Sequence, residues 1–126
     1  RDRLYCVVVS NKKGDNLRQE VAHLDWGRYF DRVVGADDAP RDKPFADPVM
    51  LAYKDSAHML DASAWFIGDS DIDLECAANV GCTAILYGEF AAAHDSFTPT
   101  HFLGVPYHAF VEDHADTLSL FMACNV

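Results

Sequence analysis

The sequence has no apolar run long enough to cross a membrane, and it shows no internal repeat or low-complexity segment. A membrane-spanning helix needs about 18 or more consecutive apolar residues, so we expect a globular protein with no membrane partner. Nothing at the amino end resembles a signal peptide, because Arg1-Asp2-Arg3 leads straight into an apolar run. The cysteine pattern, which indicates a reduced protein, favours a cytoplasmic location.

Cysteines and basic residues are also scarce. The four cysteines lack the paired spacing of zinc sites, and we interpret Cys6, Cys76 and Cys82 as small core residues of a reduced protein. Ten Lys and Arg against 20 Asp and Glu give a net charge of −10. A protein with this net charge repels nucleic acid, so we expect no nucleic-acid partner. Any phosphate-binding site must be a local region of positive charge on a negatively charged surface.

What the sequence does contain is an alternation of apolar strands and amphipathic helices. The expected strands are 4–9, 29–35, 64–67, 82–87 and a possible edge strand at 101–104. The expected helices are 15–24, 47–60, about 71–79 and one from 107 or 111 to 122, with a long loop over 88–100. This order predicts one α/β domain, residues 1–126, with a doubly wound parallel sheet.

The most informative stretch runs from Trp65 to Ala78. An apolar strand is broken at Gly68, Asp69 follows at its carboxyl end, and Asp73 falls in the first turn of a helix capped by Ser70 or Asp71. Open α/β sheets bind ligands at this edge, and two carboxylates there suit Mg²⁺. Helix capping alone would explain Asp71 and Asp73, but it leaves Asp69 unexplained.

Two other strand ends carry polar groups. Ser10 offers a hydroxyl, and the backbone N–H groups of Asn11 and Lys12 approach a helix start, which favours phosphate binding. Lys43 lies on a proline-containing loop, where its ammonium could neutralise a transferring phosphoryl group. Each feature alone is also compatible with an ordinary turn or a solvated lysine. In a parallel sheet, however, both of these strand ends share one rim with Asp69.

Together these stretches resemble the haloacid dehalogenase-like (HAD) hydrolase superfamily, and within it the phosphoglycolate phosphatase group. The resemblance covers about residues 4–88. It is carried by VVVSNK (7–12), YFDRVVGADD (29–38) with KPFADP (43–48), and FIGDSDIDLECAANVGC (66–82).

The resemblance implies a Mg²⁺-dependent phosphatase acting on a small phosphorylated metabolite, with phosphoglycolate as the leading substrate. By the same resemblance, Ser10 and Asn11 would bind the phosphoryl group and Lys43 would hold the phosphoryl oxygens and the nucleophile. Asp69 would ligate Mg²⁺, and Asp73 would support the metal or pair with Lys43. The nearby acids Asp37, Asp38 and Asp42 are interpreted as loop solvation.

The first motif of the family, an Asp-x-Asp segment that supplies the nucleophile, has no counterpart here, and the substrate-selecting cap is also missing. We therefore expect this chain to be the carboxyl-terminal part of a longer protein, truncated at the amino end of its sheet and inactive alone. The missing segment would be its partner. The alternatives are a noncatalytic HAD-like binding module and a phosphoacceptor signalling domain, which fits less well because Ser10 occupies the first strand end.

Overall fold

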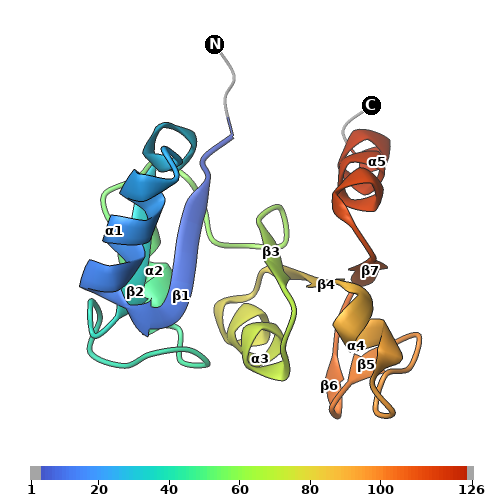
Figure 1. Ribbon diagram of the computed structural model, residues 1–126. Helices are drawn as coiled ribbons and strands as arrows, with labels where there is room; N and C mark the ends of the chain where they lie inside the picture. The colour runs from blue at the N-terminus through green and yellow to red at the C-terminus, as the bar shows by residue number, and fades with distance from the viewer. Residues whose placement is uncertain (1–3, 125–126) are drawn as a thin grey trace. The chain divides into compact units, whose positions relative to one another are not determined.

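The computed structural model describes residues 4–124, which fall into two compact units, Arg1–Leu60 and Asp61–Val126. Each unit has its own parallel sheet with helices packed on it (Figure 1). The first unit contains β1 (Val7–Lys13), α1 (Gly14–His23), the 3₁₀ turn η1 (Gly27–Tyr29), β2 (Arg32–Ala36) and α2 (Asp47–Tyr53). The predicted parallel α/β architecture is confirmed. The extent of the domain stays a prediction.

In the first unit, β1 and β2 pair in parallel, with Val8 opposite Val33 and Val9 opposite Val34. The register then shifts before Lys13 pairs with Ala36, so Ser10 to Lys12 form a bulge. The predicted strand end at Val9 is therefore where the regular ladder stops, although the strand itself continues to Lys13.

Besides the end of β1, three element boundaries in the first unit differ from the prediction by more than one residue, and one of them is the start of β1, at Val7 rather than Leu4. The second strand begins at Arg32 rather than Tyr29, because Tyr29 lies in the 3₁₀ turn η1. Helix α2 ends at Tyr53 rather than residue 60, because Lys54 has a non-helical ψ of 131° and Asp55 adopts a positive φ of 62°. A non-glycine residue in that region interrupts a helix.

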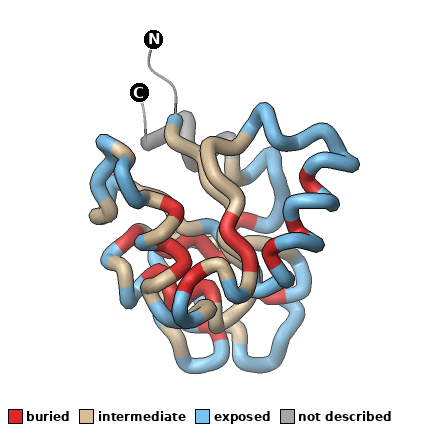
Figure 2. Tube along the Cα trace, turned by 90° about the vertical axis from the view of Figure 1, so that its left-hand side faces the viewer, coloured by how far each residue is buried: buried red, intermediate tan, exposed pale blue. Residues whose placement is uncertain are grey.

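The second unit contains β3 (Trp65–Gly68), α3 (Asp71–Val80), β4 (Thr83–Tyr87), α4 (Glu89–Ala93), β5 (His101–Phe102), β6 (Val105–Pro106), β7 (Ala109–Val111) and α5 (His114–Cys124). Its main sheet has the order β3-β4-β7, and both pairings are parallel. The buried positions, drawn red in Figure 2, include one cluster that joins α3, β4, α4 and β5. Its members are Leu74, Ala77, Ala84, Leu86, Ala91 and Phe102.

The second unit differs from the prediction in three places. The possible edge strand at 101–104 is confirmed only at β5, and β5 pairs antiparallel with β6 outside the main sheet. The predicted loop 88–100 contains α4, and the last helix begins at His114, because residues 109–111 form β7 beside β4. Among the described residues, no helix is long and apolar enough to cross a membrane.

Candidate functional site

Ser10 and Asn11 lie in the bulge at the end of the regular β1 ladder. The backbone N–H of Lys12 donates to Ser10 Oγ over 3.0 Å, which closes a tight turn around the hydroxyl. Ser10 is partly buried and Asn11 is exposed. The bulge thus presents a hydroxyl and a side-chain amide from two consecutive residues.

The Asn11 side chain ties this bulge to Lys43, 32 residues further along the chain. Asn11 Nδ2 donates to the Lys43 carbonyl over 3.2 Å, and the Lys43 N–H donates to Asn11 Oδ1 over 3.1 Å. The amide therefore satisfies both backbone groups of Lys43, as a neighbouring strand would. The structure brings Ser10, Asn11 and Lys43 together within the first unit.

The loop that carries Lys43 is held by its own side chains. Asp42 Oδ1 accepts from the Asp37 N–H over 3.1 Å, and the Arg41 guanidinium makes two hydrogen bonds to the Asp47 carboxylate, at 2.9 and 3.1 Å. Arg41 lowers the pKa of Asp47 through these hydrogen bonds. The interpretation of Asp42 as loop solvation is wrong, because its carboxylate closes the turn that leads to Lys43.

Asp69 and Asp73 lie at the junction of β3 and α3. Ser70 is the N-cap, as one of the two predicted alternatives had it, and its Oγ accepts from the Asp73 N–H. Asp73 Oδ2 in turn accepts from the Asp69 N–H over 3.2 Å and from Ser70 Oγ over 3.1 Å. Asp73 is only 8% exposed, whereas Asp69 is exposed. The buried carboxylate therefore fixes the loop on which the exposed one stands.

These two acids fit part of a magnesium site. Mg²⁺ keeps several waters and takes one or two protein carboxylates together with substrate oxygens. Asp69 offers an exposed carboxylate, while Asp73 Oδ2 already accepts two hydrogen bonds. Within residues 4–124, no group of three or more His, Cys, Asp or Glu side chains is placed to hold a metal. The donor set thus suits a site completed by water and a phosphate ligand.

The predicted site residues belong to the two units separately: Ser10, Asn11 and Lys43 to the first, and Asp69 and Asp73 to the second. Within each unit, the predicted neighbours are adjacent. Sequence reasoning missed the side-chain role of Asn11, for which only a backbone contribution was predicted. An Asn after a strand occurs in many turns, so the sequence carried no signal for a partner 32 residues away.

The match to a known protein family covers both the segment with Ser10, Asn11 and Lys43 and the segment with Asp69 and Asp73. Residues 1–87 match the haloacid dehalogenase-like hydrolase family, and the chain belongs to that family.

Among curated proteins, the phosphoglycolate phosphatases of Salmonella typhimurium and Escherichia coli K12 are each 31% identical over 78 residues. That match covers 62% of this chain but only 31% of each relative. The chain therefore spans about a third of the length of the curated relatives it matches.

Solved structures agree on the fold. A HAD-superfamily hydrolase from Ehrlichia chaffeensis superposes with a TM-score of 0.79 at 26% identity, covering 97% of this chain and 51% of that one. A subfamily IA HAD hydrolase from Geobacter sulfurreducens gives a TM-score of 0.73 at 20% identity, covering 95% of this chain and 54% of its own. The second likeness concerns the fold alone.

Proposed function

We propose that this chain supplies the phosphate- and metal-binding parts of a Mg²⁺-dependent phosphatase that hydrolyses small phosphomonoesters, with phosphoglycolate as the first candidate substrate. Family membership and the phosphoglycolate phosphatases among the relatives support the class. The observation that carries the proposal is the paired hydrogen bonding between Asn11 and Lys43, because it ties the Lys43 backbone to the residue next to Ser10.

On the phosphate side, the roles follow from charge and hydrogen bonding. The Ser10 hydroxyl and the backbone at Asn11 donate to phosphoryl oxygens, and the Lys43 ammonium neutralises the charge that the phosphoryl group carries in the transition state. The hydrogen bonds to the Lys43 backbone fix the position of its Cα atom, so less conformational freedom is lost when a phosphate binds.

On the metal side, Asp69 would hold Mg²⁺ and Asp73 would hold Asp69 in place. The ion, when bound, polarises the phosphoryl oxygens and offsets their charge. We assign the attacking aspartate to a segment of the same protein outside these 126 residues, and we expect the chain alone to be inactive.

The test is turnover of phosphoglycolate and a panel of other small phosphomonoesters by the natural protein, with Mg²⁺ and with EDTA. K43A and D69N should each lower kcat at least about a hundredfold, because K43A removes the cation that offsets the phosphoryl charge and D69N removes the carboxylate proposed to hold Mg²⁺. The matched control is D25N, since Asp25 is exposed and pairs only with Arg28 at 3.5 Å in the described structure. Its kcat should equal that of the unaltered protein.

The results separate the alternatives. Hydrolysis that is insensitive to EDTA and to K43A would refute the proposed roles. Absence of turnover, with binding of Mg²⁺ or inorganic phosphate retained, would instead favour the noncatalytic HAD-like binding module. Turnover of other phosphomonoesters but not phosphoglycolate would overturn only the choice of substrate.

A further inference from the structure

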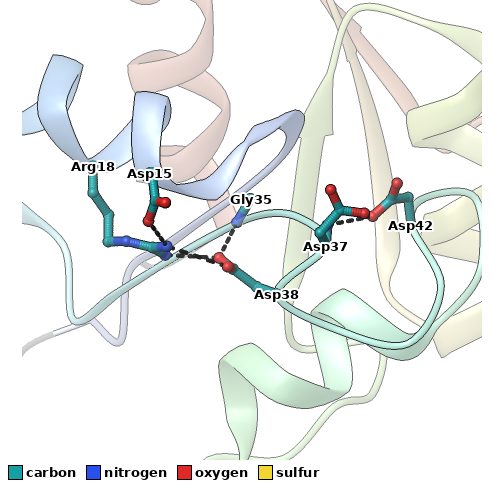
Figure 3. Close-up of polar contacts among 6 residues, drawn as sticks. All are labelled: Asp15, Arg18, Gly35, Asp37, Asp38 and Asp42. Atoms are coloured by element: carbon teal, nitrogen blue, oxygen red, sulfur yellow. Dashed lines mark hydrogen bonds and ion pairs between the residues drawn. The ribbon is translucent and has the colours of Figure 1, made fainter.

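Asp38 lies just after β2 and links three parts of the first unit. Its Oδ2 accepts from the Gly35 N–H over 2.7 Å and from Arg18 Nη1 over 2.7 Å, while Arg18 Nη2 reaches Asp38 Oδ1 at 3.3 Å and Asp15 Oδ1 at 3.2 Å (Figure 3). The Asp38 side chain is 22% exposed. The Arg18 guanidinium and the Gly35 N–H lower the pKa of Asp38. The interpretation of Asp38 as loop solvation is therefore wrong.

The backbone beneath this carboxylate is packed so closely that only glycine fits. A Cβ on Gly35 would lie 2.4 Å from Gly14 Cα and 2.6 Å from the Lys12 carbonyl oxygen. A Cβ on Gly14 would lie 2.4 Å from Asp38 Oδ1. The end of β2 thus rests directly on the segment that leads from the Ser10 bulge into α1.

The segment that runs from the Ser10 bulge into α1 and the loop that carries Lys43 (residues 37–46, the lysine loop) are consequently joined at two places. One junction is the Asn11 amide on the Lys43 backbone. The other is Asp38 with Arg18 and Gly35, and from there the bond between the Asp37 N–H and Asp42 continues towards Lys43. Two junctions fix the relation of two segments, whereas one alone would leave a hinge.

We propose that Asp38 and Arg18 are positioning residues, which hold the lysine loop in register with the Ser10 bulge. This inference rests on the proposed role of Lys43 in phosphate binding. An exposed ion pair by itself contributes little. Here the same carboxylate also satisfies a backbone N–H beside a glycine contact, so its loss frees the loop as well as the pair.

Amide hydrogen exchange tests the inference without any activity. In the natural protein, D38N and R18Q should each speed exchange of the Lys43 amide about tenfold, because the loop loses a charge-assisted hydrogen bond. R18K, which keeps the charge, should have a smaller effect. D15N is the matched control, since Asp15 contacts the same arginine in the described structure but not the lysine loop. R18Q alters an exposed helix surface and keeps the test valid if D38N unfolds.

Catalysis then separates positioning from simple stabilisation. We expect D38N and R18Q to lower kcat for the phosphomonoester substrate at least as strongly as they raise KM, with R18K restoring most of the loss and D15N unchanged. Unaltered Lys43 exchange in D38N and R18Q would overturn the inference, and so would faster exchange with unaltered kcat. If the unaltered protein lacks phosphatase activity, the proposed function fails, and the exchange data alone then decide whether Asp38 orders the loop.

Discussion

Replacing Gly68 by Ala should dislodge Asp73 and loosen the loop that carries Asp69. Gly68 ends β3, and it lies outside the positive-φ region, so alanine is permitted by the backbone. The added Cβ, however, would lie 2.3 Å from Asp73 Cβ and 2.4 Å from Asp73 Oδ2. Both contacts are far below van der Waals separation, and α3 or the Asp73 side chain must move.

The cost follows from what that movement breaks. Overpacking of this kind costs about 1–3 kcal/mol. The two hydrogen bonds that Asp73 Oδ2 accepts, from the Asp69 N–H and Ser70 Oγ, are worth about 1.5–3 kcal/mol each when intact, although water replaces part of that. We expect a total of about 2–4 kcal/mol, because steric relief and the loss of hydrogen bonds are alternative routes for the strain.

Urea unfolding followed by tryptophan fluorescence measures this change, in a W26F background that leaves Trp65 on β3 as the reporter. G27A is the matched control, because a Cβ on Gly27 would have nothing within 4 Å. It should change the unfolding free energy by less than about 0.5 kcal/mol. In the G68A/D73A double variant, the combined loss should fall below the sum of the single losses. If G68A proves no more destabilising than G27A, Asp73 does not pack on Gly68 as described.

Three further outcomes are expected. Because Arg18 lowers the pKa of Asp38, the ionised carboxylate stabilises the fold at pH values above its unfolded pKa of about 3.9. This contribution to stability is lost as the pH falls through the lower folded pKa. The urea midpoint of D38N should therefore fall less steeply in acid than that of the unaltered protein. H108A should cost about 1–3 kcal/mol, since the Ala84 N–H loses its acceptor at His108 Nδ1, whereas H108N should cost less, and thermal melts compare the two. Residues 61–126 contain no Lys or Arg, so raising NaCl from low to moderate concentration should stabilise the unit that holds Trp65 by screening repulsion, and a constant or falling midpoint would contradict this.

Most of the parallel fold was predictable because short, local stretches of apolar residues specify its buried strands. The β3 strand, the break at Gly68 and the cap at Ser70 lie within one residue of their predicted places, since an apolar run, a glycine and a serine act locally. β7 was not predictable from its three residues, because what makes them a strand is the pairing of Phe110 with Leu86. A strand of two or three residues is too short to show a hydrophobic period, and the strand it pairs with is distant in sequence.

The candidate site likewise has a part that local sequence predicts and a part that depends on distant contacts. Asp69 and Asp73 are four residues apart, and the N-cap turn at Ser70 brings the Asp69 N–H to the Asp73 carboxylate, so local sequence was sufficient. The Asn11 contact with Lys43 and the Asp38 contact with Arg18 span 32 and 20 residues, and they depend on how β1, β2 and α1 pack. No local rule distinguishes these polar residues from solvated ones. Asn11 was therefore assigned a backbone role only, Asp38 was assigned to loop solvation, and Arg18 was assigned no role.

The distribution of charge matches the division of roles in the proposed function. All ten Lys and Arg residues lie in residues 1–60, the unit that holds Ser10, Asn11 and Lys43, whereas residues 61–126 hold half of the 20 acids and no Lys or Arg. A phosphate contact gains from neighbouring cations, and a Mg²⁺ ligand gains from their absence, because an adjacent ammonium would compete for the carboxylate. Asp69 therefore stands in a unit that contains no Lys or Arg, which is consistent with its proposed role as a Mg²⁺ ligand.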